Sequence, residues 1–408
     1  MSHSSPARPV ALPGAFSGIA EPAFGVDAYY PEQSADRKQH RSARLLPTRV
    51  PALATAAVMS VHWIRPLVSV GAVVVGLGIS FLIIALNGED AGEAARALYD
   101  GSFGTRQQAA ATVSRALPLV LVALGWIVAF SARRINVGFE GQILAGGIAA
   151  TCAALYLEGL PAPLHLAVGV VFGILGGAMY AAIAAVLWAR RGVNEIVSTL
   201  LLNFVALQLF GWLIRGPWQG RGTRRAGTRL IPETARWPNL IERSPLNYDL
   251  LVVIGLVFIV AFVLRRTSFG LALRLTGANV EAARAAGVRT VRVGALSLVI
   301  SGALAGLAGA DLVLGGETGA VQEGFASTFG LEGIVVALLA QNQPWAVAPS
   351  ALLLASLRQG GSLMEARVGI PAELLLITQG VVVLVVIAST TAVRRMRAAP
   401  IAPPPDVT

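Results

Sequence analysis

The 408-residue chain is 55% hydrophobic and only 13% charged, whereas soluble domains carry about 25% charged residues, so the composition excludes a soluble protein and predicts an integral membrane protein. Its net charge of +10 comes almost entirely from arginine. Because arginine gathers in the cytoplasmic loops of membrane proteins, we expect the partner to be the lipid bilayer and not nucleic acid. The single cysteine, Cys152, excludes an internal disulfide and a metal site built from a cysteine cluster.

The first part of the chain lacks sustained apolar periodicity. Residues 1–55 are rich in serine, proline, alanine and charge, and they lack the basic start and apolar core of a signal peptide. We expect a disordered cytoplasmic tail, whose basic end (36–44) either stays solvated or contacts lipid headgroups. The expected organisation is this tail, a transmembrane domain over residues 56–395 and a cytoplasmic C-terminal tail over residues 396–408.

Ten apolar stretches follow the tail, most of them long enough to cross about 30 Å of hydrocarbon. The eighth and ninth are short, and the polar residues 341–344 between them favour a broken or re-entrant pair. We therefore expect an all-α polytopic bundle of eight to ten transmembrane helices. The predicted spans are Pro66–Leu86, Ala116–Ala132, Phe139–Leu157, Leu164–Ala189, Ile196–Ile214, Asp249–Leu264, Val293–Leu314, Leu331–Ala340, Trp345–Leu357 and Ala372–Thr391.

Pairs of arginines close four of these stretches and set the predicted orientation in the cell membrane. Alternate crossings bring all four pairs to one side, which the positive-inside rule assigns to the cytoplasm. Both termini and the loop 267–292 then lie in the cytoplasm, and the loop 215–247 lies outside. That outer loop holds seven arginines, against the rule, but four paired ends outweigh one loop. The pairs are Arg133–Arg134, Arg190–Arg191, Arg265–Arg266 and Arg394–Arg395.

The loop 267–292 is polar and arginine-rich, and its middle predicts a short helix. Asn279 is a typical N-cap, Glu281 complements the helix dipole in the first turn, and Gly287 suits the C′ position. The Glu-Ala-Ala-Arg-Ala-Ala run between them is a strong helix former. About eight helical residues span only ~12 Å, so we expect a helix at the membrane surface that is shaped for docking. The alternative is an ordinary interhelical loop with a surface helix.

Polar residues within the apolar region are informative, because a charge at bilayer depth costs at least about 2.5 kcal/mol. Asn136, Glu140 and Gln142 form a first cluster, in which two glycines permit irregular backbone. Such backbone is tolerated at depth only where it is buried in protein or faces a water-filled cavity. The cluster therefore indicates either a bent start of the third helix that lines a pathway, or a cytoplasmic turn capped by Asn136.

Two further clusters follow. In the second, Asn194 and Glu195 suit an N-cap and a first turn, while Asn203 lies about two turns deeper. At that depth Asn203 needs a hydrogen-bond partner, from another helix or from a permeating solute. In the third, Glu332 precedes an unbroken apolar run and is the better pathway candidate. The other acids of the third cluster are Asp311, Glu317 and Glu323.

Four motifs resemble those of the permease subunits of ABC importers. Elements similar to those of the nucleoside- and purine-type members lie at residues 136–142 (NVGFEGQ), 193–203 (VNEIVSTLLLN) and 330–344 (GLEGIVVALLAQNQP). Residues 269–287 (FGLALRLTGANVEAARAAG) resemble the cytoplasmic coupling loop of the branch that serves sugars, nucleosides and branched-chain amino acids. The four motifs also occur in the order that the family shows.

The resemblance implies a type II-like ABC importer permease, in which the coupling loop docks into a cleft of a separate ABC ATPase subunit. It further implies a second permease chain, identical or homologous, and an extracytoplasmic solute-binding protein. The residues expected to couple to the ATPase are Gly277, Asn279, Glu281, Ala282, Ala283, Arg284 and Gly287. The candidate residues of the translocation pathway are Asn136, Glu140, Gln142, Glu195, Asn203, Glu332 and Asn342.

The sequence has no GxxxxGK[ST] phosphate-binding loop and no recognisable catalytic or metal-ligand pattern. We therefore expect no enzyme activity and no cofactor bound by this chain, with ATP used by the partner subunit. The resemblance favours a nucleoside as the solute, with a simple sugar or a branched-chain amino acid as the alternative. An ion-coupled secondary transporter is less favoured, because it would need unpaired acids at mid-bilayer.

Overall fold

A computed structural model of the chain describes residues 64–86, 88–220, 227–241, 244–316 and 319–369, together with 377, 379–385 and 388–389. Both predicted tails, half of the last predicted span and the arginine pair after that span lie outside the described residues. Within the described ranges the chain is helical, and three isolated β-bridges occur in place of a sheet.

The helices alternate with short connections, and one longer irregular loop follows α7. In chain order they are α2 (Ile64–Leu86), α3 (Ala91–Phe103), α4 (Arg106–Ser131), α5 (Phe139–Tyr156), α6 (Ala162–Arg191), α7 (Glu195–Arg215), the 3₁₀ turn η4 (Glu233–Ala235), α8 (Asp249–Arg266), α9 (Ser268–Ala278), α10 (Val280–Ala285), α11 (Thr290–Leu314), α12 (Phe329–Leu339) and α13 (Pro344–Val368).

Among the described residues, four helices are long and apolar enough to cross a membrane: α4, α6, α7 and α11. Helices α8 and α9 form a further candidate that is bent by 69°. Shorter apolar helices occur at Gly71–Leu86 and Phe329–Leu339. The all-α polytopic membrane fold predicted from the sequence is thereby confirmed, and the number of eight to ten crossings stays a prediction.

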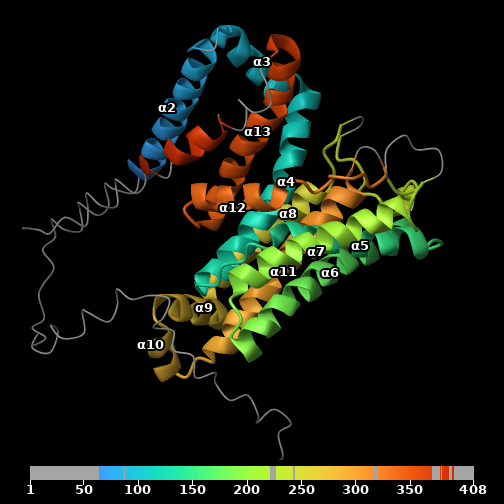
Figure 1. Cartoon of the computed structure of the whole chain (residues 1–408), viewed down its shortest axis with the longest axis vertical. Coiled ribbons are helices and arrows are strands. Elements are labelled where there is room, and N and C mark those ends of the chain that lie inside the picture. The colour runs from blue at the N-terminus through green and yellow to red at the C-terminus, as the bar shows by residue number, and fades with distance from the viewer. Residues whose placement is uncertain are drawn as a thin grey trace, which may run out of the picture.

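Helix α11 lies at the centre of the bundle, where it packs against α4, α5 and α6 (Figure 1). Glycines bring the backbones of α6 and α11 into direct contact. A Cβ atom on Gly306 would lie 2.3 Å from the carbonyl oxygen of Gly173, and one on Gly177 would lie 2.3 Å from that of Gly302. Small residues four apart permit such close approach of helices in lipid.

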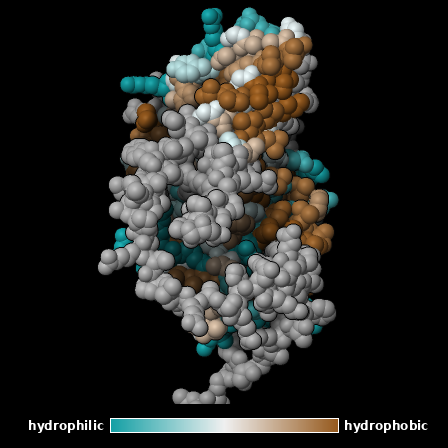
Figure 2. Space-filling view, turned by 90° about the vertical axis from the view of Figure 1, so that its left-hand side faces the viewer, coloured by the Kyte–Doolittle hydropathy of each residue, from teal (hydrophilic) through white to brown (hydrophobic). Residues whose placement is uncertain are grey.

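Helices α2, α3 and α13 form the other end of the molecule, and α4 runs from them into the bundle (Figure 1). Figure 2 shows a hydrophobic surface over this part of the face, where α2 lies. A continuous apolar surface of this kind suits contact with lipid tails or with another apolar protein surface. The exposed apolar residues of α2 include Val74, Val75, Ile79, Leu82 and Leu86.

The sequence did not predict α3, because only long apolar runs were taken as helices. The predicted ninth span ends at Leu357, before the end of α13 in the structure. Helix α3 has only 13 residues, and it buries Ala94, Ala97 and Gly101. Helix α13 continues to Val368 because α3 packs against its polar second half.

Three arginines, at the end of α7 or in the loop after it, tie this part of the chain to the rest of the fold. The Arg229 guanidinium donates to the Leu155 carbonyl in the last turn of α5. That of Arg236 donates to the Gly316 carbonyl after α11, at 2.7 Å. Arg215 pairs with Glu323. A helix C-terminus carries partial negative charge and favours a cation, so these arginines have structural roles that need no cytoplasmic placement.

The close contact of α6 and α11 predicts that Gly306→Ala destabilises the protein. The added methyl group must push the two backbones apart, and overpacking of this kind costs about 1–3 kcal/mol. The measurement is the unfolding temperature of the detergent-solubilised chain. Gly211→Ala is the matched control, because a Cβ atom at that position of α7 meets nothing within 4 Å. Equal changes in the two variants would contradict the backbone contact.

Candidate functional site

The predicted surface helix is present as α10, at the end of the bundle where α9 also lies (Figure 1). The Asn279 side-chain oxygen accepts a hydrogen bond from the Ala282 N–H at 3.0 Å, as an N-cap does. Gly287 has a φ of +82°, the left-handed conformation that favours glycine at a helix C-terminus. The sequence analysis did not identify α9, although Thr267 caps it by accepting from the Gly270 N–H at 3.1 Å.

The seven expected coupling residues divide by exposure. Ala283 is buried, and Gly277 packs so closely on the end of α4 that a Cβ atom there would lie 2.2 Å from the Ser131 carbonyl oxygen. Helix α10 therefore buries Ala283, contacts α9 and α11, and keeps a face of small and charged side chains exposed. The residues on the open face are Asn279, Glu281, Ala282, Arg284 and Gly287.

A non-helical segment joins α4 to α5, and the buried Asn136 lies within it. The Asn136 amide nitrogen donates to the Gln142 Oε1 and to the Ser301 hydroxyl, both at 2.9 Å. Its oxygen accepts from the Gly138 N–H and from the Gln142 Nε2, both at 3.0 Å. Asn136 and Gln142 are almost wholly buried, so this structure places both amides inside the protein, where they hold α5 against α11.

Helix α7 completes the hydrogen bonding of the same segment. The Asn203 Oδ1 accepts from the Gly141 N–H at 2.8 Å, and its Nδ2 donates to the Val137 carbonyl at 2.9 Å. The Thr199 hydroxyl accepts from the Val137 N–H at 3.3 Å. The N-cap residue of α5 is Gly138, which has no side chain to cap the helix. Asn203 thus caps α5 from a neighbouring helix.

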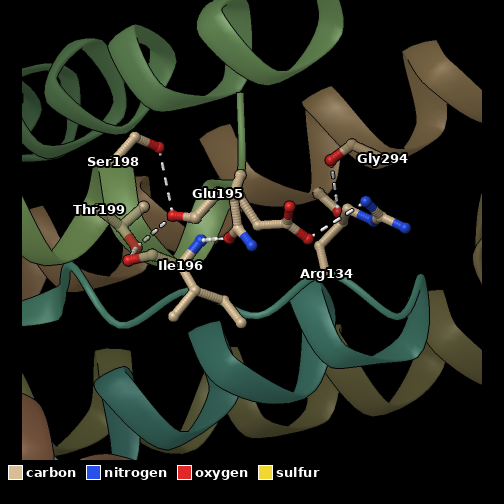
Figure 3. Close-up of polar contacts among 8 residues, drawn as sticks. Arg134, Glu195, Ile196, Ser198, Thr199 and Gly294 are labelled. Carbon is tan, nitrogen blue, oxygen red and sulfur yellow. Dashed lines mark hydrogen bonds and ion pairs between the residues drawn. The ribbon is translucent and has the colours of Figure 1, made fainter. Parts of the chain in front are cut away.

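Glu195 pairs with an arginine that the sequence analysis used only as a marker of orientation. Figure 3 shows the Arg134 guanidinium directed at the Glu195 carboxylate, with 3.1 Å between Nη1 and Oε1. The same guanidinium lies 4.5 Å from the ring centroid of Trp188 in the last turn of α6. A Cβ atom on Gly294 of α11 would lie 2.8 Å from the Trp188 ring. Arg134 could have been identified from the sequence, because an acid within the membrane such as Glu195 needs a basic partner.

Glu332 has a partner on α13. The Arg358 Nη1 lies 3.0 Å from both carboxylate oxygens of Glu332, and the Thr328 hydroxyl donates to Oε1 at 3.0 Å. The Arg358 guanidinium also lies 5.0 Å from the Phe329 ring centroid. Glu140 is close by, because a Cβ atom on the adjacent Gly330 would lie 2.5 Å from the Glu140 Cγ. Arg358 directly follows the ninth predicted span, and its position there could have indicated a basic partner for Glu332.

The remaining candidates lie apart from these clusters. The Asn342 oxygen accepts from the Trp126 indole N–H at 3.1 Å, in the turn between α12 and α13. Asp311 is buried in the last turn of α11. Glu323 pairs with Arg215, and Glu317 is outside the described residues. The candidate residues therefore form a helix junction around Asn136, an ion pair around Arg134, and a partly exposed polar group around Glu332.

Three proteins of known assignment are similar to this chain over most of its length. The glucose ABC transporter permease protein TsgB13 of Haloferax volcanii is 35% identical over 291 residues, which are 67% of this chain and 74% of the relative. The guanosine permease protein NupP of Bacillus subtilis is 31% identical over 338 residues, 82% and 95% of the two chains. The nucleoside permease protein NupB of Lactococcus lactis is 30% identical over 294 residues, 70% and 80% of the two chains.

Residues 108–387 also match the family model described as a branched-chain amino acid transport system permease component. The matched segment is more than half of the chain, and it includes all four motifs and the three clusters described above. This agreement confirms the resemblance drawn from the motifs. The chain therefore belongs to the family of branched-chain amino acid transport system permeases.

Proposed function

We propose that this chain is the membrane-spanning subunit of an ABC importer that carries a nucleoside. The observation that supports this most is the exposed face of α10, anchored to the bundle of a permease family. Two relatives, NupP and NupB, are named as guanosine and nucleoside permeases. TsgB13, a glucose permease with 35% identity, supports a simple sugar as the second candidate.

The open face of α10 docks in a cleft of a separate ATPase subunit, which supplies the force for transport. This places the end of the molecule that carries α9 and α10 in the cytoplasm. Three arginine pairs support the placement, because they end or follow α4, α6 and α8, and α4 and α8 both contact α9. Basic residues at one end of a bundle mark its cytoplasmic side, and both termini then lie there as well.

The polar group around Glu332 lines the translocation pathway, at the surface that faces a second permease chain. It comprises Glu140, Thr328, Glu332 and Arg358, and Thr328 is exposed in the single chain. Charged groups inside a membrane protein face a water-filled cavity or the bundle interior. The carboxylate, guanidinium and hydroxyl groups of this set suit hydrogen bonds to a nucleobase and its ribose.

The pairing of Glu195 with Arg134 and of Glu332 with Arg358 makes these two acids unsuited to ion coupling, and membership of a transport-system permease family favours an ATP-driven permease. A proton- or sodium-coupled mechanism would need acids whose charge is not already compensated. An extracytoplasmic binding protein delivers the solute to the opposite end, where the loop 215–247 lies. Residues of this loop line a cavity of about 780 Å³, among them Glu233, Arg236 and Trp237, together with the starts of α4 and α6 and the end of α11.

Glu281→Arg tests the docking of the ATPase. Reversing a charge at an interface costs several kcal/mol, so we expect the ATPase subunit that co-purifies with the permease to fall at least about tenfold. Glu93→Arg is the matched control, because Glu93 is also an exposed glutamate in the first turn of a helix, on α3. Unchanged co-purification with Glu281→Arg would refute the docking proposal.

Arg358→Met tests the pathway assignment. The change leaves the Glu332 charge without its partner; for a half-buried pair this costs about 1–3 kcal/mol, less than for a fully buried one. We expect ATP-driven uptake to fall about tenfold, and the double variant Glu332→Gln/Arg358→Met to regain part of it. Uptake in proteoliposomes is the measurement. Wild-type uptake by Arg358→Met would remove this group from the pathway.

A solute panel tests the class of cargo. We expect nucleosides to compete for uptake by the assembled complex at concentrations where simple sugars and branched-chain amino acids do not. The measurement is inhibition of labelled nucleoside uptake in proteoliposomes with the ATPase and binding protein present. Competition by a sugar alone would establish the second candidate.

A further inference from the structure

The docking helix α10 leads directly into α11 and contacts both α9 and α11, while α9 also contacts α4. Helix α9, which carries α10, ends against the C-terminus of α4. A Cβ atom on Gly277 would lie 2.2 Å from the Ser131 carbonyl oxygen and 3.5 Å from the Arg133 backbone nitrogen. Leu273 of α9 is fully buried in the main hydrophobic core. Two backbones in contact move together, because no flexible side chain lies between them.

The end of α4 leads at once into the Arg134 ion pair (Figure 3). Three residues after Ser131, the Arg134 side chain contacts three other helices. It binds Glu195 at the start of α7, stacks on Trp188 at the end of α6, and its Cδ lies 3.5 Å from the position of a Cβ on Gly294 of α11. A planar guanidinium is suited to bind a carboxylate and an aromatic face together.

Two residues later, Asn136 enters the buried amide network with Gln142 of α5 and Ser301 of α11. Residues 131–138 therefore connect α9 with five helices of the bundle over one short, non-helical segment. Side-chain or backbone hydrogen bonds hold this segment at Arg134, Asn136, Val137 and Gly138. Because this segment is short and held by hydrogen bonds, it is suited to transmit a displacement of α9 to the bundle.

This junction also contains unused hydrogen-bonding capacity. Among the described residues, five buried side-chain polar atoms have no hydrogen-bond partner, and two of them are here: the Thr276 hydroxyl, next to Gly277, and the Arg134 Nε. Buried polar groups in native proteins are nearly always paired.

We propose that Gly277 and Arg134 are positioning residues that transmit the movement of α9 and α10 to the bundle through α4. Gly277 keeps the two backbones in contact, and Arg134 distributes the movement of α4 to α6, α7 and α11. The proposal rests on the proposed function as an ABC permease, and it adds the route by which the ATPase acts on the pathway. The proposal gives α4 the role of transmitting the movement, although the chain continues from α10 directly into α11.

Gly277→Ala tests the route in the assembled complex with its ATPase and binding protein, reconstituted in proteoliposomes. We expect the ATPase to remain bound and to hydrolyse ATP, while the solute taken up per ATP hydrolysed falls roughly tenfold. Gly255→Ala is the matched control, because a Cβ atom there meets nothing within 4 Å. It is expected to behave as the wild type.

A second pair of variants tests the route through α4 if Gly277→Ala does not reach the membrane. Arg134→Lys keeps the charge but loses the planar group, and Arg133→Lys makes the same change at the exposed neighbour. We expect only Arg134→Lys to lower uptake per ATP. Wild-type uptake per ATP in Gly277→Ala and Arg134→Lys would overturn the route alone. Failure of the wild-type chain to retain an ATPase would overturn the proposed function as well.

Discussion

The non-helical segment between α4 and α5 must have its backbone polar groups hydrogen-bonded. The arrangement of the bundle depends on this constraint. In a bilayer, non-helical backbone is tolerated only where protein or enclosed water satisfies its polar groups. The segment that starts α5 satisfies them with Asn136, Thr199 and Asn203. Helix α5 can begin at this position because α7 supplies the cap that Gly138 lacks.

Ion pairs add a second layer to the same organisation. Arg134 and Arg358 each hold a carboxylate from another helix, and each guanidinium also lies near an aromatic ring. A charge in this environment is costly unless it is compensated. The two pairs therefore link the end of α4 with α7 and α13 with α12, with the charge of each carboxylate compensated.

The sequence predicted the features that depend on local chemistry. The cap at Asn279, the left-handed Gly287 and the apolar cores of the long helices follow from single residues or from runs of them. Features that depend on residues far apart in the chain could not be predicted from the sequence. No local pattern shows that Asn203 caps α5 or that Arg358 meets Glu332. Helix α3 was missed for the same reason, since its apolar face is short and gains meaning only against α13.

The contact between α3 and α13 bears on how the protein is made. Helix α13 carries Arg358, Glu365 and Arg367 in its second half, which makes that half a poor candidate to leave the translocon by hydrophobicity alone. Its partners on α3 emerge from the ribosome far earlier: Ser102 bonds the Ser356 carbonyl 254 positions later in the chain, and Asp100 binds Arg367. The second half of α13 is therefore held by an element that is synthesised long before it, so this contact can form only after most of the chain has been made.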